Sequence, residues 1–311
     1  MPFTAKSGKF NASINTVEFG TGDKAVKIGG ENVFPLYSFD AAIENAPKVG
    51  IEITDFGMEH EPECIKKYYE GCATLADMAR KAASMEGVDF LSFRMEGGDP
   101  NGANKSTEEL IGELKEIADA VDLPLVVCGC KNVEKDAELF SKAAEALNGK
   151  NAVILSAKEE NYKTVGAAAG LAYKQVVGAE SAVDINLAKQ LNVLISQLGV
   201  DSKSVVMNVG TAAVGYGFEY VISTMDRVKA AALAQGDVTL QMPIITPVAS
   251  EAWGVKEAMA SETDAPEWGS QEERGIDMEV ETAMAVIAAG SNAVILKHPE
   301  SIKIISGLMK E

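Results

Sequence analysis

The sequence predicts an α/β fold: a single (β/α)8 TIM barrel preceded by an N-terminal β-hairpin extension. Short apolar runs, bounded by glycine, proline or acidic residues, recur eight times along the 311-residue chain. Longer segments with helical periodicity separate these runs, which is the pattern of βα units around a parallel sheet. Eight such units close into one barrel, and the chain length suits that fold.

The extension and the barrel meet at residue 48. Residues 1–48 contain the alternating stretch FNASINTVEFGTGDKAVKIGG, with a Gly-Thr-Gly-Asp turn at residues 20–23, and predict a β-hairpin. We expect the hairpin to close the bottom of the barrel or to contact a partner. Residues 49–311 then form the barrel itself.

Each barrel strand is predicted from an apolar or β-branched run. The fifth is the least distinct, because VGAAAGLAYKQVVGAES from residue 165 also fits one helix, and without it the units would form an open doubly wound sheet. No G-x-G-x-x-G follows any strand, and residues 160–184 leave room for one more strand, which favours the barrel. The predicted strands are VGIEITDF (49–56), VDFLSFRM (88–95), LPLVVCGC (123–130), NAVILSA (151–157), QVVGAES (175–181), SVVMNVG (204–210), LQMPIITPVA (240–249) and NAVILKH (292–298).

Two of the intervening helices carry clear start signals. Ser106 followed by Glu109 predicts a capping box for a helix over residues 106–121. Asp184 is the expected N-cap of a helix over residues 184–200. Both helices are amphipathic, as the outer layer of a barrel requires.

One connection stands out by its length. Residues 250–275, between the seventh strand and its helix, contain both tryptophans of the chain, Trp253 and Trp268. Loops of this length are usually functional. A lid over a ligand, an anchor for a protein partner and a simply packed excursion are the alternatives.

Charge and hydropathy exclude several classes of partner. The chain has 28 basic and 46 acidic residues, a net charge of −18, which disfavours nucleic acid and anionic membrane surfaces. The first residues, MPFTAKSGKF, lack the apolar core of a secretory signal, and no apolar run is long enough to span a bilayer. We expect a soluble, cytoplasmic protein.

The cysteines and histidines do not predict a metal centre. The four cysteines show no C-x-x-C pairing, and two histidines are too few to complete ligand sets. We therefore expect reduced, structural thiols and no Fe–S cluster carried by this chain alone. The shortage of histidine also argues against Ser/His/Asp chemistry and metal-assisted hydrolysis. These residues are Cys64, Cys72, Cys128, Cys130, His60 and His298.

The barrel mouth is where polar strand residues carry functional information, because TIM-barrel sites lie at the C-terminal ends of the strands. In the second strand Phe90, Ser92 and Arg94 share one face, and alternation directs Arg94 into the barrel. Glu52 and Thr54 point inward from the first strand in the same way. An Arg94–Glu52 ion pair is the structural alternative to a ligand-contacting arginine.

The candidate ligand-binding residues are mostly amides, hydroxyls and glycines, which suit a neutral, amide-decorated ligand. No pattern of a nucleophile or an acid–base pair accompanies them, so no catalytic residue and no metal ligand is predicted. A Schiff-base lysine at Lys297 or Lys131 is an alternative that rests on fold analogy alone. The candidates are Asp55, Arg94, Glu96, Lys131, Asn132, Ser156, Asn208, Gly210, Thr211 and Tyr216.

The order of these segments resembles a known family. FRMEGGDPNG after the second strand, VVCGCKN at the third, ILSAKEEN at the fourth and VVMNVGTAAVGYGFE at the sixth are similar to the small subunit of the corrinoid iron–sulfur protein. This is the delta-type subunit of the acetyl-CoA decarbonylase/synthase system. The likeness covers essentially the whole chain, and the barrel is more distantly similar to pterin-binding methyltransferases.

The resemblance implies a methyl-carrier role without catalytic residues of its own. It implies a heterodimer in which the large subunit holds an Fe–S cluster and a cobalamin-binding domain, while this barrel packs against the cobalamin (corrinoid) at the interface. The assembled protein would carry a methyl group on cobalt from methyltetrahydrofolate methyltransferase to acetyl-CoA synthase, both transient partners, in the reductive acetyl-CoA pathway. No individual corrin contact is implied, so the candidate residues above rest on barrel geometry.

The alternative function is a methyltetrahydrofolate-dependent methyltransferase. In it, Asn208 and a carboxylate such as Asp55 would hold and protonate the pterin. The pterin-binding relatives hold folate mainly through Asp and Asn at strand ends. At the matching positions this chain has Arg94-Met95-Glu96 and Cys128-Gly129-Cys130, which argues against pterin binding.

Overall fold

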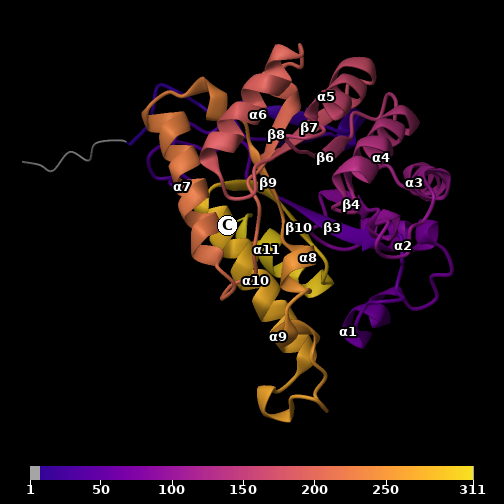
Figure 1. The fold of residues 1–311 in the computed structure, drawn as a ribbon. Coiled ribbons are helices and arrows are strands. Elements are labelled where there is room, and N and C mark those ends of the chain that lie inside the picture. The colour runs from indigo at the N-terminus through magenta and orange to yellow at the C-terminus, as the bar shows by residue number, and fades with distance from the viewer. Residues whose placement is uncertain (1–7, 311) are drawn as a thin grey trace, which may run out of the picture.

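The computed structural model, which describes residues 8–310, is a closed barrel of eight parallel strands surrounded by helices (Figure 1). The strand order around the barrel is β10-β3-β4-β5-β6-β7-β8-β9, so consecutive strands are neighbours and β10 closes against β3. The predicted TIM barrel is confirmed. Residues 1–7 of the predicted extension and residue 311 lie outside the described residues.

The strands occupy the eight predicted places, and each is shorter than predicted. Their side chains alternate between the barrel interior and the helix layer, so nearly every strand position is buried. The strands are β3 (Lys48–Thr54), β4 (Phe90–Arg94), β5 (Leu125–Cys128), β6 (Val153–Ala157), β7 (Val176–Glu180), β8 (Val205–Asn208), β9 (Ile244–Pro247) and β10 (Ser291–Leu296).

The last strand shows why the predicted lengths were wrong. Residues 292–298 were expected to be one strand, but β10 ends at Leu296. The backbone N–H groups of Lys297 and His298 donate instead to the Glu279 carboxylate, at 2.6 and 3.1 Å. Since these donors leave the sheet ladder, Lys297 is a loop residue at the mouth and not a strand residue.

The seventh strand is shortened at its start. Residues 240–249 were predicted as strand, but Val238–Leu240 form a 3-10 turn and β9 begins only at Ile244. Asp237 accepts hydrogen bonds from the backbone N–H and the hydroxyl of Thr239, at 3.1 and 2.6 Å. This local turn competes with the extended conformation that the apolar run favours.

The helices cover the outside of the barrel. The segment before the fifth strand is helical, with a π-helix at Gly166–Ala172, and the chain then enters β7, which confirms the fifth strand. The α-helices are α1 (Glu63–Lys66), α2 (Leu75–Ala83), α3 (Thr107–Ala120), α4 (Val133–Ala146), α5 (Tyr162–Val165), α6 (Ile185–Gln197), α7 (Phe218–Ala234), α8 (Ala249–Ala252), α9 (Lys256–Met259), α10 (Gln271–Ala289) and α11 (Pro299–Leu308). None of the helices within residues 8–310 is long and apolar enough to cross a membrane.

The two predicted helix starts differ in outcome. Asp184 caps α6 by accepting from the backbone N–H groups of Asn186 and Leu187, at 2.8 and 3.2 Å, as predicted. Ser106 caps α3 by accepting from Glu109 N at 3.2 Å. The reciprocal bond from Ser106 N to the Glu109 side chain is not among the contacts of the described residues, so only half of the predicted capping box forms.

The N-terminal hairpin closes the bottom of the barrel, as predicted. Strands β1 (Val17–Phe19) and β2 (Val26–Ile28) pair antiparallel, and their buried side chains pack against residues that fill the barrel interior. The Phe19 ring meets the Phe90 ring edge to face, with centroids 5.5 Å apart. Gly20 N donates to Asn151 O at 2.7 Å, immediately before β6. The hairpin therefore shields the barrel interior from solvent at the N-terminal ends of the strands.

The opposite end of the barrel carries the long connection. The connection predicted at residues 250–275 corresponds to residues 248–270, which form α8, α9 and a 3-10 turn at Pro266–Trp268, because α10 already begins at Gln271. Figure 1 shows α9 and the segment after it projecting from the barrel at the end where α1 also lies. We call residues 248–270 the excursion. Together with the loop after β3, it lines part of the barrel mouth.

Candidate functional site

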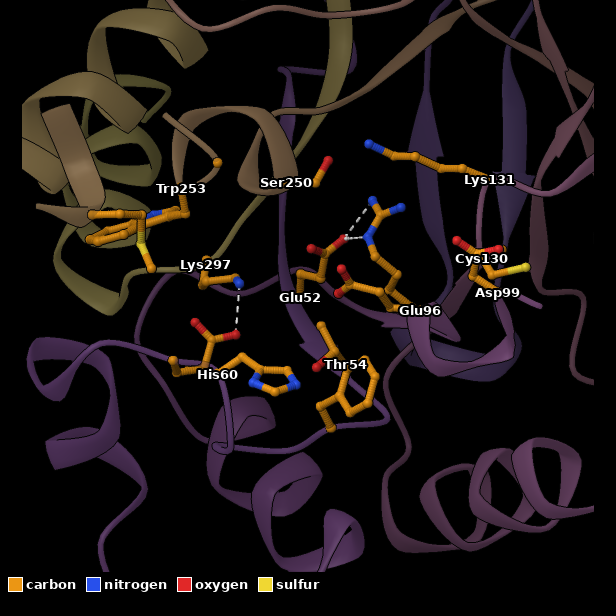
Figure 2. Close-up of a pocket in the computed structure, with 16 residues that line it drawn as sticks. Glu52, Thr54, His60, Glu96, Asp99, Cys130, Lys131, Ser250, Trp253 and Lys297 are labelled. Carbon is orange, nitrogen blue, oxygen red and sulfur yellow. Dashed lines mark hydrogen bonds and ion pairs between the residues drawn. The ribbon is translucent and has the colours of Figure 1, made fainter. Parts of the chain in front are cut away.

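The barrel mouth contains two adjoining cavities. The first, of about 380 Å³, lies over the ends of β3, β4 and β5 and is walled by the excursion (Figure 2). The second, of about 270 Å³, lies over the ends of β5, β6, β7 and β8. Both are lined by Arg94, Gly129, Lys131 and Ser250, so they form two halves of one mouth.

A buried ion pair lies at the base of the mouth. Arg94 Nε donates to Glu52 Oε2 at 3.0 Å, and Nη2 lies 2.9 Å from the same oxygen. The two side chains are only 8% and 1% exposed. Burial alone would lower the pKa of the guanidinium, but the Glu52 carboxylate outweighs it and the pKa of Arg94 is raised. The predicted inward direction of Arg94 and its pairing with Glu52 are confirmed.

Arg94 retains donor capacity for a ligand. Its Nη2 is buried and has no hydrogen-bond partner among residues 8–310, because the contact with Glu52 is close in distance but not aligned. The residue lines both cavities. The two interpretations of Arg94, structural pair and ligand contact, are therefore compatible in one side chain.

The second cavity gathers four of the predicted residues. Asn208 Nδ2 donates to Ser156 Oγ at 3.0 Å, and Gly210 N donates to Asn208 Oδ1 at 3.1 Å. Thr211 Oγ1 is buried without a hydrogen-bond partner within the described chain. This wall offers hydroxyl groups whose protons are free to donate, and all four residues line the cavity.

Lys131 and Glu96 are two further predicted charged residues that reach the mouth. Lys131 lines both cavities, and its Nζ pairs with Glu251 Oε1 at 3.1 Å. Glu96 is exposed and lines the first cavity beside Glu52 (Figure 2).

Asp55 lines neither cavity. Its carboxylate accepts two hydrogen bonds from Gly97 N, at 2.9 and 3.1 Å, and pairs with Lys105 Nζ at 3.1 Å. The side chain is fully buried. The structure thus places Asp55 where it fastens the glycine-rich loop after β4.

Two further candidates also lie away from the cavities. Asn132 caps α4, its Oδ1 accepting from Lys135 N at 3.1 Å. Tyr216 is half exposed, and its hydroxyl donates to Glu257 at 2.6 Å, which ties the loop after β8 to the excursion. A ligand role for Asn132 or Tyr216 stays a prediction. The geometry of the mouth does not support it.

Several residues that line the mouth were not singled out in the sequence. Glu180 was identifiable, because it ends β7 and faces the second cavity, where it pairs with Lys158 at 3.3 Å. Lys297, which the sequence suggested only as a Schiff-base lysine, lines the first cavity (Figure 2) and pairs with Glu61 at 2.7 Å. The loop positions that give Glu61, Ser250 and Glu251 their places have no periodicity, and nothing local marked them.

The tryptophans of the excursion have different surroundings. Trp253 is buried, lines the first cavity and stacks on His298, with ring centroids 5.8 Å apart and 14° between planes. Burial lowers the pKa of His298 to about 4, so the imidazole is neutral there at pH 7. Trp268 is 36% exposed, and the Lys256 and Arg274 cations lie 5.0 and 5.6 Å from its ring centroid. Trp253 therefore belongs to the packed wall of the mouth, while Trp268 faces outward.

The thiols near the mouth are protonated. Burial raises the pKa of Cys128 to about 11 and that of Cys130 to about 12. The four cysteines are unpaired. Across residues 8–310 no group of histidine, cysteine and acidic side chains is arranged to hold a metal ion.

The fold and the site define a single TIM barrel with a divided, hydrogen-bonding mouth. Solved structures with the same fold include dihydropteroate synthase from Xanthomonas albilineans with 4-aminobenzoic acid, with a TM-score of 0.56 and 12% identity over 95% of this chain and 97% of that one. Dihydropteroate synthase from Thermus thermophilus with 4-aminobenzoate has a TM-score of 0.54 and 13% identity over 94% and 98%. At these identities the likeness shows the fold alone.

The sequence comparisons identify the family. The family model described as CO dehydrogenase/acetyl-CoA synthase delta subunit matches residues 16–309, and the chain belongs to this family. Acetyl-CoA decarbonylase/synthase complex subunit delta 1 of Methanosarcina thermophila is 30% identical over 92% of this chain and 66% of its own length. The delta subunit of Methanothermobacter thermautotrophicus is 31% identical over 95% and 75%. The predicted resemblance is confirmed, and the chain spans about two thirds of the length of the Methanosarcina relatives.

Proposed function

We propose that this chain is the delta-type subunit of an acetyl-CoA decarbonylase/synthase system and that its barrel mouth holds one side of a cobalamin. A larger partner subunit would hold the other side and carry an Fe–S cluster, giving a heterodimer. The complex would take a methyl group from methyltetrahydrofolate methyltransferase and deliver it to acetyl-CoA synthase in the cytoplasm. Membership of the delta-subunit family supports the assignment to this complex. The hydrogen-bonding groups of the barrel mouth support cobalamin as the ligand.

The observation that carries the ligand assignment is the set of unused donors in the mouth. Thr211 Oγ1 and Arg94 Nη2 are buried and make no hydrogen bond within residues 8–310, although Nη2 lies 2.9 Å from Glu52 Oε2. The Ser156 hydroxyl receives a bond from Asn208 while its own proton is free. A buried donor without an acceptor costs about 1–3 kcal/mol, which a ligand carbonyl would recover. The acetamide and propionamide side chains around a corrin present such carbonyls, so these residues fit the cofactor.

The residues of this chain then bind and orient, and the bound corrinoid supplies the cobalt that carries the methyl group. The hydrogen bond to Glu52 fixes the Arg94 guanidinium, so its remaining N–H donors stay oriented toward the mouth. Asn208 is fixed between Ser156 and Gly210 N, so the second wall is also preorganised. The excursion, with Trp253 in its packed wall, excludes water from one side. In this proposal no side chain of the barrel accepts or donates a proton during methyl transfer.

The alternative of a methyltetrahydrofolate-dependent methyltransferase has less support in the mouth. Its proton donor would be Asp55, whose carboxylate is buried and already engaged by Gly97 N and Lys105. Asn208, its other ligand, is available at the second cavity.

Cobalamin binding with and without the partner tests the proposal. The isolated chain should bind cobalamin weakly, and the complex co-purified from native extract should contain cobalt and bind tightly. Calorimetry of the isolated chain with methyltetrahydrofolate distinguishes the alternative. Micromolar binding of the folate, with no cobalt in the purified complex, would contradict the carrier role.

A further inference from the structure

We propose that the Lys131–Glu251 ion pair is a latch that divides the mouth in the ligand-free protein. A ligand that covers both cavities opens it by offering Lys131 a carbonyl or anionic oxygen in place of Glu251. This inference rests on the proposed function, because it takes a corrinoid as the ligand wide enough to cover both cavities.

The ion pair crosses the mouth from one side to the other. Lys131 follows β5, and Glu251 lies on α8 directly after β9. In the closed strand order, β5 and β9 are four places apart in a ring of eight, which puts them on opposite sides of the barrel. Figure 2 shows the Lys131 side chain extending over the mouth toward Ser250, the neighbour of Glu251 in sequence.

The ion pair also coincides with the partition between the two cavities. Lys131 and Ser250 line both of them, and Glu251 lines the second. Of the donors that we assign to the ligand, Arg94 lines both cavities, and Thr211 and Ser156 line the second. A ligand in contact with both halves must therefore pass over or displace this pair.

Both ends of the latch are attached to rigid backbone. Asp136 is buried and accepts from Cys130 N at 2.7 Å, and a side chain at Gly129 would overlap its carboxylate, so this turn is tightly packed. Lys131 itself has a φ of 69°, a left-handed conformation that a lysine adopts only when its surroundings impose it. On the other side, buried Ala249 and Ala252 anchor α8. Opening the latch thus requires only side-chain rotation.

The pair is weak enough to open. Its side chains are 66% and 35% exposed, whereas those of Arg94 and Glu52 are almost fully buried. Exposed ion pairs contribute little to stability and are screened by salt, while a buried pair resists separation. A ligand therefore displaces Glu251 from Lys131 and leaves the Arg94–Glu52 pair at the base of the mouth intact.

The first test is the affinity of the heterodimer for cyanocobalamin after Glu251→Gln. The variant no longer has an ion pair to break, so its affinity should rise about two- to fivefold at low salt, and the difference should shrink at high salt. Glu145→Gln is the matched control, because it breaks the exposed Lys142–Glu145 pair on the outer surface of α4. That variant should bind like the wild type.

The second test observes the lysine directly. Reductive ¹³C-dimethylation keeps the charge of each lysine and gives it an NMR signal. The Lys131 signal, assigned with Lys131→Arg, should shift in Glu251→Gln without ligand and should shift in the wild type when cyanocobalamin binds. Binding with an unmoved Lys131 signal, or unchanged or weaker affinity in Glu251→Gln, would overturn the latch alone. Absence of cyanocobalamin binding in both proteins would overturn the proposed function and the latch with it.

Discussion

Arg94 and Glu52 form an ion pair inside the barrel mouth, with Nε 3.0 Å from Oε2, across the adjacent strands β3 and β4. A buried pair gives little net stability over an apolar pair of the same volume, but loss of one partner leaves an uncompensated charge. Glu52→Leu should therefore lower the free energy of unfolding by about 3–5 kcal/mol, measured by urea denaturation.

Two companion variants separate charge burial from simple loss of a glutamate. Glu18→Leu removes a partner from the exposed Lys27–Glu18 pair and should change stability by less than about 1 kcal/mol. Adding Arg94→Met to Glu52→Leu should restore most of the lost stability. Equal losses in Glu52→Leu and Glu18→Leu would show that the buried pair has no special role.

A second buried pair holds the N-terminal extension to the barrel. Lys229 Nζ lies 2.8 Å from Glu31 Oε1 and 2.9 Å from Asn292 Oδ1. Burial alone would raise the pKa of Glu31, but Lys229 and Asn292 outweigh it, and the pKa is lowered from its ordinary 4.5. A carboxyl of this kind stabilises the folded state above pH 4.5, and that stability is lost as the pH falls through the lower folded-state pKa.

Lys229→Met should therefore destabilise the protein most at neutral pH. Unpaired Glu31 would cost about 3–5 kcal/mol at pH 7. Without Lys229, burial raises the pKa of this carboxyl, so it protonates and the difference from the wild type should shrink as the pH falls from 7 to 4.5. Urea denaturation of the variant and the wild type at pH 7 and at pH 4.5 measures this difference in the free energy of unfolding. Lys27→Met, in an exposed pair, should show a small difference at both. A Lys229→Met difference that does not depend on pH would contradict the assignment.

His298 predicts a separate loss of stability in mild acid. Burial lowers its folded-state pKa from 6.5 to about 4, although Glu272 opposes the shift. The unfolded chain then binds a proton that the folded chain does not, so stability is complete above pH 6.5 and falls by about 3 kcal/mol between pH 6.5 and 4.

His298→Asn tests this directly, because asparagine can also cap α11, where His298 Nδ1 accepts from Glu300 N at 3.2 Å. The variant should lose much less stability than the wild type between pH 6.5 and 4, measured by thermal or urea unfolding. His60→Asn, at an exposed position, should keep the wild-type profile. Identical profiles for His298→Asn and wild type would show that other groups cause the acid loss.

Thr211 should separate folding from binding. Its hydroxyl is buried without a partner within residues 8–310, so Thr211→Val should leave stability unchanged or raise it by up to about 1 kcal/mol. The same change should weaken cyanocobalamin binding by the heterodimer about five- to tenfold. Thr282→Val is the matched control, since Thr282 lines neither cavity and donates to Met278 O at 2.7 Å, and it should lose at least about 1 kcal/mol with unchanged affinity. Unchanged affinity in Thr211→Val would remove Thr211 from the site.

Much of the mouth was predictable because it follows from local alternation. Strand parity placed Arg94, Glu52 and Thr54 inside the barrel, and strand ends placed Ser156, Asn208, Gly210 and Thr211 together. Asp55 and Asn132 also follow strands, but their position at a strand end did not predict that their side chains turn away from the cavities. Their side chains bond the adjacent loop and helix instead, because unpaired backbone N–H groups at those turns compete for them.

By itself the sequence determined the barrel, the hairpin and the identity of most inward-facing residues, since periodicity, caps and strand order act over a few residues. Only the tertiary structure decided which distant groups meet. The Lys131–Glu251 pair joins residues 120 apart in sequence, across opposite sides of the barrel. Such contacts depend on the closure of the ring, which brings opposite strand ends within reach of single side chains, and no local pattern records that distance.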